Sequence, residues 1–263
     1  MTRTAPPIDG IWLLDLDGVV WLGNDPIAGS AEAIGRLRDA GHRVAFFTNN
    51  SFSSRADLLR KFAEHGIAAT AEDVLSSADA AAGLLEPGER AFVLGGQGIV
   101  EALGARGVEV VPDPRPGEVD VVVVGLDRDL HFDRLTIATR AVSAGARLLG
   151  TNDDATYPTP DGPLPGGGAL LAAVAYATGV EPLVAGKPNQ PAVDLVARRL
   201  GNVAVMVGDR PSTDGVFGVR LGARYALVRS GVTPAGAAVP DLTPDLDAPD
   251  LASLVEGVLV AAG

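Results

Sequence analysis

Cysteine is absent from this chain of 263 residues, and a long apolar run is absent too. Without cysteine there can be no disulfide bond and no zinc or iron–sulfur centre held by thiolates. No apolar stretch approaches the roughly 18 residues that a helix needs to span a bilayer, so no membrane partner is expected. Residues 1–7 form a short polar segment, and two aspartates interrupt the apolar run that follows it. A secretory signal does not have this pattern, and we expect a cytoplasmic location.

Positive charge is also scarce. The chain has 21 lysines and arginines against 33 aspartates and glutamates, which gives a net charge of −12. Nucleic-acid binding needs basic patches or runs of lysine and arginine, so no nucleic-acid partner is expected. The acidity does not exclude a small phosphate ester, because bound magnesium can reverse the sign of the local field. Hydrophobic residues make up 47% of the chain, which predicts a globular protein.

Strand-like and helix-like segments alternate almost throughout the chain, a pattern typical of an α/β fold with a parallel sheet. The first series of segments is interrupted by a second α/β unit and then resumes. We therefore expect a core domain from residues 1–79 and 184–263, with an inserted α/β domain over residues 80–183. Residues 76–82 and 182–186 are the predicted hinges between them.

The stretch from residue 11 to residue 20 is the most informative part of the chain. A short apolar run, typical of a strand buried on both faces of a parallel sheet, ends in Asp15 and Asp17, with Gly18 next. Open α/β sheets bind their ligands just beyond the carboxyl ends of such strands. Negative charge beside a hydrophobic core is costly unless a cation compensates it. The motif therefore indicates a divalent metal and chemistry on an anion, whereas the alternative is an exposed turn.

Two further apolar strands deliver polar residues at their carboxyl ends. Thr48 and Asn49 follow one of them, and Asp209, with Asp214 five residues later, follows the other. Lys187 adds a cation after a strand-like segment. Hydrolysis of a phosphate ester needs these groups: a carboxylate nucleophile, a second carboxyl for proton transfer, and positive charge and donors for the phosphoryl oxygens.

The order of these motifs resembles the haloacid dehalogenase (HAD) superfamily of phosphatases, in which Asp-x-Asp precedes Ser/Thr, Lys and an acidic motif. The insertion is similar to the subclass IIA cap, an α/β cap of the C2 type found in the NagD and p-nitrophenyl-phosphatase-like group. The resemblance covers nearly the whole chain and includes Thr151-Asn152-Asp153-Asp154, Gly186-Lys187-Pro188 and Gly208-Asp209-Arg210. It implies a Rossmann-like catalytic core and an inserted cap that selects the substrate.

The resemblance also implies roles for individual residues. Asp15 would be the nucleophile and Asp17 the general acid and base. Thr48 and the backbone of Asn49 would hold the phosphoryl oxygens. Lys187 would balance the charge on the nucleophile and on the phosphoryl group. The implied activity is hydrolysis of small phosphate monoesters, such as sugar, polyol or related metabolite phosphates, through an aspartyl-phosphate intermediate.

Magnesium is the implied cofactor. Its ligands would be the carboxylate of Asp15, the backbone carbonyl of Asp17 and the carboxylate of Asp209. Asp214 would act through a water molecule or by orienting a ligand. The implied partner is a small phosphorylated metabolite, and the sequence leaves a homodimer open.

A loop of the expected cap supplies three candidate substrate-binding residues, Asn152, Asp153 and Asp154. It carries two carboxylates and no base, so it should repel a second anion on the substrate. Monophosphates of neutral polyols or sugars are therefore the predicted substrates. An arginine that reached the cleft could reverse this preference, and the candidates are Arg128, Arg134 and Arg210.

Two other functions stay open at this point. A phosphotransferase or phosphomutase would use the same aspartates but return the phosphoryl group to an organic acceptor instead of water. A non-catalytic HAD-like binding protein would keep the fold without the reaction. The second alternative is disfavoured because every chemical role of the motif series is filled.

The chain departs from the pattern of the group near its acidic motif. Pro211-Ser212 stands where leucine and an acidic residue are usual, and Gly215-Val216 replaces Asp-Ile. No proposed catalytic position is affected, but the geometry around Asp214 is expected to differ. Farther along, residues 233–249 are rich in proline, alanine and aspartate and are predicted to form a surface loop.

Overall fold

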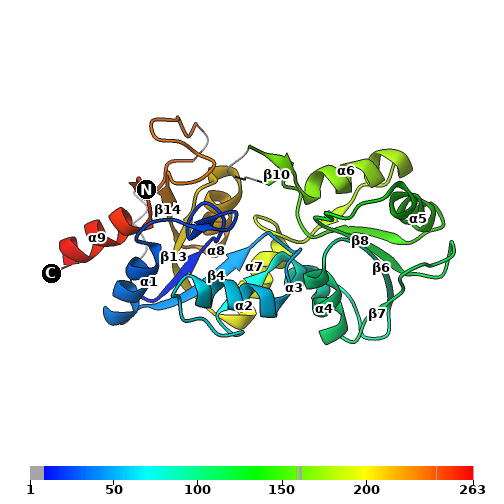
Figure 1. Ribbon diagram of the computed structural model, residues 1–263, viewed down its shortest axis with the longest axis horizontal. Coiled ribbons are helices and arrows are strands. Elements are labelled where there is room, and N and C mark those ends of the chain that lie inside the picture. The colour runs from blue at the N-terminus through cyan, green and yellow to red at the C-terminus, as the bar shows by residue number, and fades with distance from the viewer. Residues whose placement is uncertain (1–8, 158, 160–161, 241, 263) are drawn as a thin grey trace.

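The computed structural model describes residues 9–157, 159, 162–240 and 242–262. It shows two α/β units side by side along the long axis of the molecule (Figure 1). The core unit holds a sheet whose strands lie within residues 11–76 and 203–248, and the cap unit holds a sheet whose strands lie within residues 90–184. The predicted fold class, an α/β core with a parallel sheet and an inserted α/β cap, is confirmed.

The core sheet has six strands in the order β15-β14-β13-β1-β4-β5, and all neighbouring pairs are parallel. The strands are β1 (Ile11–Leu14), β4 (Arg43–Thr48), β5 (Val74–Ser76), β13 (Val203–Gly208), β14 (Arg224–Val228) and β15 (Leu246–Ala248). The central strands are continuous apolar runs because helices cover both of their faces. Since β1 pairs with both β13 and β4, the carboxyl ends of these three strands meet at one edge of the sheet.

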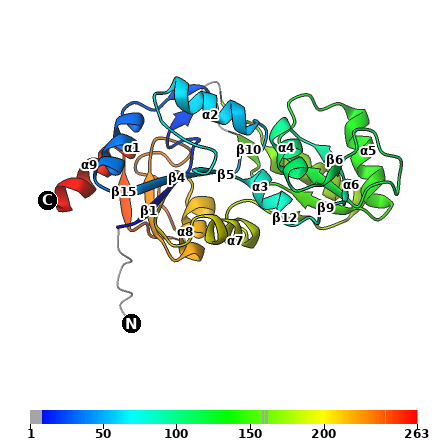
Figure 2. The same cartoon turned by 90° about the horizontal axis from the view of Figure 1, so that it is seen from below.

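Helices pack on both faces of the core sheet (Figure 2). The helices that bury their apolar side chains on one face are α1 (Ser30–Asp39), α2 (Arg55–Glu64) and α9 (Leu251–Ala262). Those on the other face are α3 (Ser77–Ala82), α7 (Gln190–Arg199) and α8 (Val216–Leu221). The two apolar layers bury both sides of the central strands, which fixes the register of the edge where their carboxyl ends lie.

The cap sheet has five strands in the order β12-β9-β8-β6-β7, again all parallel. The strands are β6 (Arg90–Leu94), β7 (Glu109–Val110), β8 (Val121–Val124), β9 (Arg147–Gly150) and β12 (Leu183–Val184). Its helices are α4 (Gln97–Ala105), α5 (Phe132–Ser143) and α6 (Gly167–Thr178). α5 and α6 bury one face of the sheet, and α4 packs on the other.

One hydrophobic cluster runs without a break from the core unit into the cap unit. It joins buried residues of the core sheet, such as Phe47, to buried residues of α3, such as Ala81. From α3 it continues through Ile99 of α4 to Val121 of the cap sheet. The two sheets therefore share an apolar contact through α3 and α4, in addition to the two chain crossings.

Three short elements lie close to the edge where the core strands end. β2 (Trp21–Leu22) and β3 (Asp25–Pro26) form a small antiparallel hairpin after β1, and β10 (Thr156–Tyr157) and β11 (Leu164–Pro165) form another in the cap unit. A π-helical turn, η1 (Pro211–Gly215), follows β13. Among the described residues, no helix is both long and apolar enough to cross a membrane.

Three segments contain regular structure that the sequence did not predict. Residues 76–82, a predicted hinge, contain α3, whose first turn is fixed by a capping box between Ser76 and Asp79. Residues 182–186, the other predicted hinge, contain β12, and residues 233–249, predicted as a loop, contain the edge strand β15. Elements of two to six residues are too short for a periodic pattern, and their pairing or packing partners lie elsewhere in the chain.

The packing around Phe62 gives a test of the core. Phe62 is fully buried, and its ring lies 4.5 Å from that of Phe46 and 5.0 Å from that of Trp21. We expect Phe62→Ala to lower the free energy of unfolding by about 3–5 kcal/mol in urea denaturation followed by circular dichroism. The matched control is Phe132→Ala, because Phe132 is 82% exposed and its loss should cost less than about 0.5 kcal/mol. Equal losses in the two variants would contradict this account of the core.

Candidate active site

The predicted motif residues converge at the carboxyl edge of the core sheet. Asp15 and Asp17 follow β1, Thr48 ends β4, and Asp209 follows β13. Lys187 comes from a different direction, because it follows β12 of the cap sheet. One cleft brings these side chains together with groups from the cap, and the predicted residues that line it are Asp15, Asp17, Thr48, Asn49, Asn152, Asp154, Lys187, Asp209 and Asp214.

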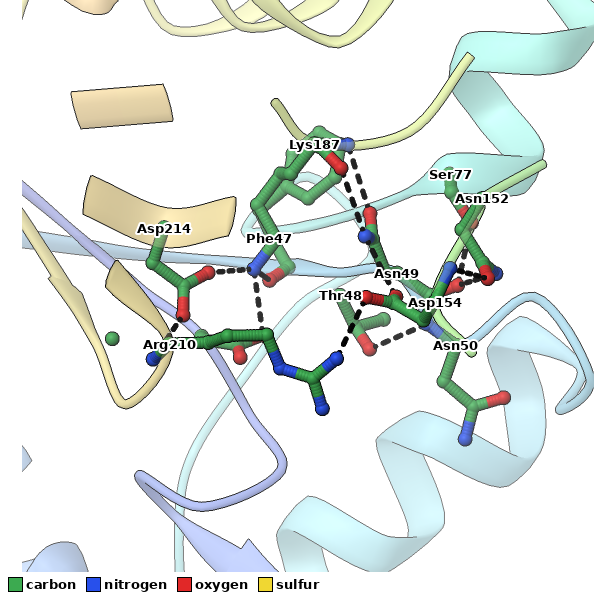
Figure 3. Close-up of polar contacts among 12 residues, drawn as sticks. Phe47, Thr48, Asn49, Asn50, Ser77, Asn152, Asp154, Lys187, Arg210 and Asp214 are labelled. Carbon is green, nitrogen blue, oxygen red and sulfur yellow. Dashed lines mark hydrogen bonds and ion pairs between the residues drawn. The ribbon is translucent and has the colours of Figure 1, made fainter. Parts of the chain in front are cut away.

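Lys187 is the buried cation of this cleft, with 1% of its surface exposed. Its Nζ lies 2.8 Å from Oδ1 of Asp15 and 2.7 Å from Oδ1 of Asp214, and it donates to the carbonyl of Phe47 at 3.2 Å. Figure 3 shows its contacts with Phe47 and Asp214. Burial alone would lower the pKa of Lys187, but the two carboxylates outweigh burial and raise it. The ammonium is therefore charged at any physiological pH.

Three carboxylates crowd together beside this lysine. Oxygens of Asp15, Asp209 and Asp214 all lie within 4.8 Å of one another. Burial, with the repulsion from Asp214 and Asp209 added to it, raises the pKa of Asp15 well above its usual range, although Lys187 opposes the shift. Burial and the nearby Asp214 raise the pKa of Asp209 to about 7. Asp209 and Asp214 are buried and Asp15 is partly so. One lysine does not neutralise three such carboxylates, so this set of hard oxygen donors suits a divalent cation.

The three carboxylates are not equally available to a metal ion. Asp214 accepts from Lys187 through Oδ1 and from the backbone N–H of Arg210 through Oδ2, at 3.1 Å. Asp209 accepts from the backbone N–H of Val232 through Oδ2. Both oxygens of Asp214 are thus committed within the protein, which leaves Asp15 and Asp209 as the better ligands. The π-helical turn that carries Asp214 spans Pro211–Gly215, where the sequence departs from the pattern of the group.

Glycine is required opposite Asp209. A Cβ atom at Gly231 or at Gly18 would overlap the carboxylate of Asp209, and the backbone of Gly18 has φ of +87°. Side chains other than hydrogen would therefore push the Asp209 carboxylate out of the cluster. The glycine after Asp17 is thus a steric requirement of the site as well as a turn signal.

Asn49 joins the core unit to the cap unit, which the sequence did not indicate. Its side-chain amide donates to Asp154 Oδ2 at 2.9 Å and to the carbonyl of Lys187 at 3.1 Å, and its Oδ1 accepts from the Lys187 N–H at 2.9 Å (Figure 3). Its backbone carbonyl accepts from Asn152 Nδ2 and from Ser77 Oγ, each at 2.8 Å. The predicted role of Asn49 involved its backbone, whereas its side chain fixes the position of Lys187.

The predicted cap residues take different positions. Asn152 is buried and bonds Asn49, and Asp154 is half-buried between Asn49 and Arg210, whose guanidinium lies 3.0 Å away. Burial raises the pKa of Asp154, and Arg210 partly opposes that shift. Asp153 is exposed and does not line the cleft. Of the three arginines considered, Arg210 lines the cleft and balances the charge of Asp154.

Tyr157 is a residue of the cleft that the motif analysis missed. Its hydroxyl donates to Oδ1 of Asp17 at 2.8 Å, across a sequence separation of 140 residues. Burial raises the pKa of Asp17, whereas the bond from Tyr157 and the charge of Lys61 act in the opposite direction. Burial and the neighbouring Asp17 also raise the pKa of Tyr157, so the phenol keeps its proton. The only available signal was an aromatic residue with a polar tip in the cap loop.

Comparison with known proteins identifies relatives of this chain. A haloacid dehalogenase-like hydrolase family model matches residues 12–109, and a second HAD-like hydrolase model matches residues 184–254. An acid sugar phosphatase from Staphylococcus saprophyticus is 36% identical over 229 residues, which cover 84% of this chain and 87% of the relative.

Solved structures resemble the whole fold. A p-nitrophenyl phosphatase from Archaeoglobus fulgidus superposes with a TM-score of 0.86 at 31% identity, covering 95% of this chain and 100% of its own. A glycerol phosphate phosphatase from Mycobacterium tuberculosis, in complex with magnesium, gives a TM-score of 0.82 at 35% identity. That match covers 93% of this chain and 75% of the mycobacterial one.

The ion cluster predicts that Lys187 supports folding. Lys187→Met leaves Asp15 and Asp214 buried without their cation, so the free energy of unfolding in EDTA should fall by about 3–5 kcal/mol. The pKa of Asp15, already raised in the folded state, should rise further. A group whose folded pKa is raised stabilises the fold at low pH and loses that contribution as the pH rises through the folded pKa. The deficit should therefore grow as the pH increases through the raised pKa that Asp15 has in the folded wild type, because at lower pH Asp15 is protonated in both proteins.

The matched control for this measurement is Lys61→Met, which removes the other lysine of the chain. Lys61 lies over the ring of Trp21 at 4.0 Å, and among the described residues it forms no ion pair as close as the two of Lys187. Its loss should cost about 1 kcal/mol, with a smaller dependence on pH than in Lys187→Met, because the charge of Lys61 acts on Asp17 alone and from a greater distance. A deficit in Lys187→Met that is small or independent of pH would argue against the ion cluster.

Proposed function

We propose that this chain, which belongs to the haloacid dehalogenase-like hydrolases, hydrolyses small phosphate monoesters through a covalent intermediate on Asp15. Its family and its phosphatase relatives make it a phosphoric monoester hydrolase. The observation that carries the proposed mechanism is the contact of the Asp15 carboxylate with the buried Lys187, at 2.8 Å, in a cleft that Asp17 also lines. Residues 80–183 would serve as the substrate-selecting cap over a catalytic core from residues 1–79 and 184–263.

The first step is attack by the Asp15 carboxylate on phosphorus. A bond forms between an Asp15 oxygen and phosphorus, and the bond from phosphorus to the ester oxygen breaks. Lys187 offsets the negative charge that would otherwise keep the carboxylate and the phosphoryl group apart. Its position is fixed by Asp214 and by Asn49 before substrate arrives, so little reorganisation is needed during the reaction.

Asp17 donates a proton in the first step and accepts one in the second. As an acid it gives its proton to the ester oxygen, which leaves as an alcohol. As a base it then takes a proton from water while that water attacks phosphorus, the bond to Asp15 breaks, and inorganic phosphate forms. Burial raises the pKa of Asp17, which favours the protonated form that the first step requires.

Thr48 and Asn49 are suited to hold the phosphoryl oxygens. The Oγ1 of Thr48 accepts from the backbone N–H of Asn50 at 3.0 Å, so its own hydroxyl proton can be donated to a phosphoryl oxygen. The side chain of Asn49 is occupied by Lys187 and Asp154, which leaves its backbone N–H for this purpose. Both residues line the cleft beside Asp15.

A divalent cation, for which we propose magnesium, fits the donor set of the cleft. Asp15, Asp209 and the backbone carbonyl of Asp17 would hold it. When bound, the ion neutralises charge on the carboxylates and on the phosphoryl oxygens. The crowding of three carboxylates supports the assignment, and the mycobacterial glycerol phosphate phosphatase was solved with magnesium.

The proposed substrates are phosphate monoesters of sugars, polyols or related small metabolites. Asp154 lines the cleft with a carboxylate that accepts from Asn49 and Arg210, and each of its oxygens has a further lone pair for a substrate hydroxyl. Asn152 holds this loop in place, because its amide donates to Asn49 and accepts from the backbone N–H of Asp154. The cleft should repel a second anion less strongly than the loop sequence predicts, because Asp153 is exposed and Arg210 balances Asp154. Recognition of substrate hydroxyls therefore supports these substrates. The relatives of this chain include an acid sugar phosphatase and a glycerol phosphate phosphatase, which is consistent with the same substrate class.

The direct test is phosphate release from a panel of sugar, polyol and carboxylate-bearing phosphate monoesters with magnesium. Asp15→Asn should reduce turnover to background because it removes the nucleophile, and Asp17→Asn should reduce it about 10²–10⁴-fold. Asp153→Asn is the matched control, with turnover like that of the wild type. Turnover like that of the wild type in Asp15→Asn would refute the mechanism, and transfer of phosphate to an added sugar without release would identify a phosphotransferase.

The metal assignment has a separate test at Asp209. Asp209→Asn should raise the magnesium concentration for half-maximal activity more than about 10-fold. Because a ligand that binds only the folded state stabilises it, magnesium should also raise the Tm of the wild type and of Asp153→Asn, but not that of Asp209→Asn. If the magnesium titrations of Asp209→Asn and wild type coincide, Asp209 is not a ligand.

A further inference from the structure

Tyr157 reaches from the cap unit to the carboxyl group that the proposed mechanism uses for proton transfer. It lies in β10, in the short hairpin with β11, and its side chain is half-buried. Its hydroxyl donates to Oδ1 of Asp17 at 2.8 Å. Asp17 belongs to the loop after β1, so this bond connects the two units directly at the proposed acid.

The same two residues stand between two cavities. Asp17 and Tyr157 line the catalytic cleft, and both also line a second cavity of about 550 Å³. The second cavity extends between the core and cap units, and its wall includes Trp21, Phe52 and Arg128. The tyrosine ring is held there beside Arg128, whose guanidinium lies 5.9 Å from its centre. The hydroxyl of Tyr157 therefore reaches Asp17 from a ring with packed neighbours.

A carboxyl group that transfers a proton needs a fixed orientation. Gly18, the next residue, has φ of +87° and no side chain to restrict its neighbour. Tyr157 holds Oδ1, and the side chain of Trp21 also donates to this carboxyl from the core side. Because each carboxyl oxygen has two lone pairs, the group can still exchange a proton with the ester oxygen or with water. Proton transfer depends steeply on such alignment.

We propose that Tyr157 is a positioning residue, which holds the Asp17 carboxyl in the orientation for protonating the leaving alcohol and supplies this contact from the cap. The inference rests on the proposed function, in which Asp17 is the acid. It makes the proton-donating step depend on the cap hairpin being seated against the core. A structural role alone would instead affect all substrates to the same extent.

The test compares two substrates that differ in their need for an acid. Glycerol phosphate releases a poor leaving group that must be protonated, whereas p-nitrophenyl phosphate releases a phenolate that leaves with little help. In Tyr157→Phe we expect kcat/KM to fall about 10- to 100-fold for glycerol phosphate, the usual range for loss of a hydrogen bond to a charged group. For p-nitrophenyl phosphate it should fall by less than about 3-fold, since that step makes little use of Asp17.

Tyr176→Phe is the matched control, because Tyr176 belongs to the cap helix α6 and is 94% exposed. It should leave both substrates unchanged. Thermal unfolding of each variant shows whether the fold is intact. Equal falls for the two substrates in Tyr157→Phe, or no fall for glycerol phosphate, would overturn the proposal.

Asp17→Asn separates this inference from the proposed function. If Asp17→Asn hydrolyses glycerol phosphate like the wild type, Asp17 is not the acid and the proposed mechanism fails. If Asp17→Asn is strongly impaired while Tyr157→Phe is not, the mechanism stands and only the role of Tyr157 is wrong. In the double variant, Tyr157→Phe should add less than about 2-fold to the defect of Asp17→Asn, because groups that act through one another are not additive.

Discussion

The buried ion cluster around Lys187 is the constraint on which the rest of the site depends. Asp15, Asp209 and Asp214 have oxygens within 4.8 Å of one another, and such crowding is strongly unfavourable without a cation. Lys187 compensates two of these carboxylates at 2.7–2.8 Å, and its own burial is tolerated only because they do so. Gly18 and Gly231 leave space for the carboxylate of Asp209, which a Cβ atom at either position would overlap. The arrangement therefore prepares an electrostatic environment that receives an anionic group and a divalent cation together.

The site is shared between two units that the chain builds from different parts of its length. The core supplies the strand ends, and the cap supplies Asn152, Asp154 and Tyr157, which bond core residues on both sides of the cleft. Asn49, Arg210 and Asp17 are the core groups that meet them. Polar contacts at the cleft thus lie beside the continuous apolar cluster of α3 and α4. The polar contacts determine what the cleft recognises, and the apolar cluster holds the two sheets together.

The features that could be predicted from the sequence are those defined by neighbouring residues in the chain. Asp15 and Asp17 could be identified because an apolar strand followed by carboxylates and glycine is a local pattern, and the order of later motifs made the fold recognisable. Tyr157 could not be identified from a pattern, and Arg210 could be named only as one of three candidate arginines, because their partners lie 140 and 56 residues away and depend on how the two units meet. β15 was missed for a related reason, since a three-residue edge strand is defined by its pairing with β14.

The connection from the cap sheet back to the core is very short, and this limits how the two sheets can separate. The backbone N–H of Ala185 is still bonded to Gly150 of the cap sheet, at 2.9 Å, while that of Lys187 is bonded to Asn49 of the core, also at 2.9 Å. Gly186 alone stands between these anchors, and two residues extend over at most about 7 Å. Translation of the cap away from the core at this corner would pull Lys187 from its carboxylates. If the cap separates widely from the core, it must therefore rotate about a pivot near Gly186. Lys187, which lies next to that pivot, would then move less than any residue of the cap farther from it.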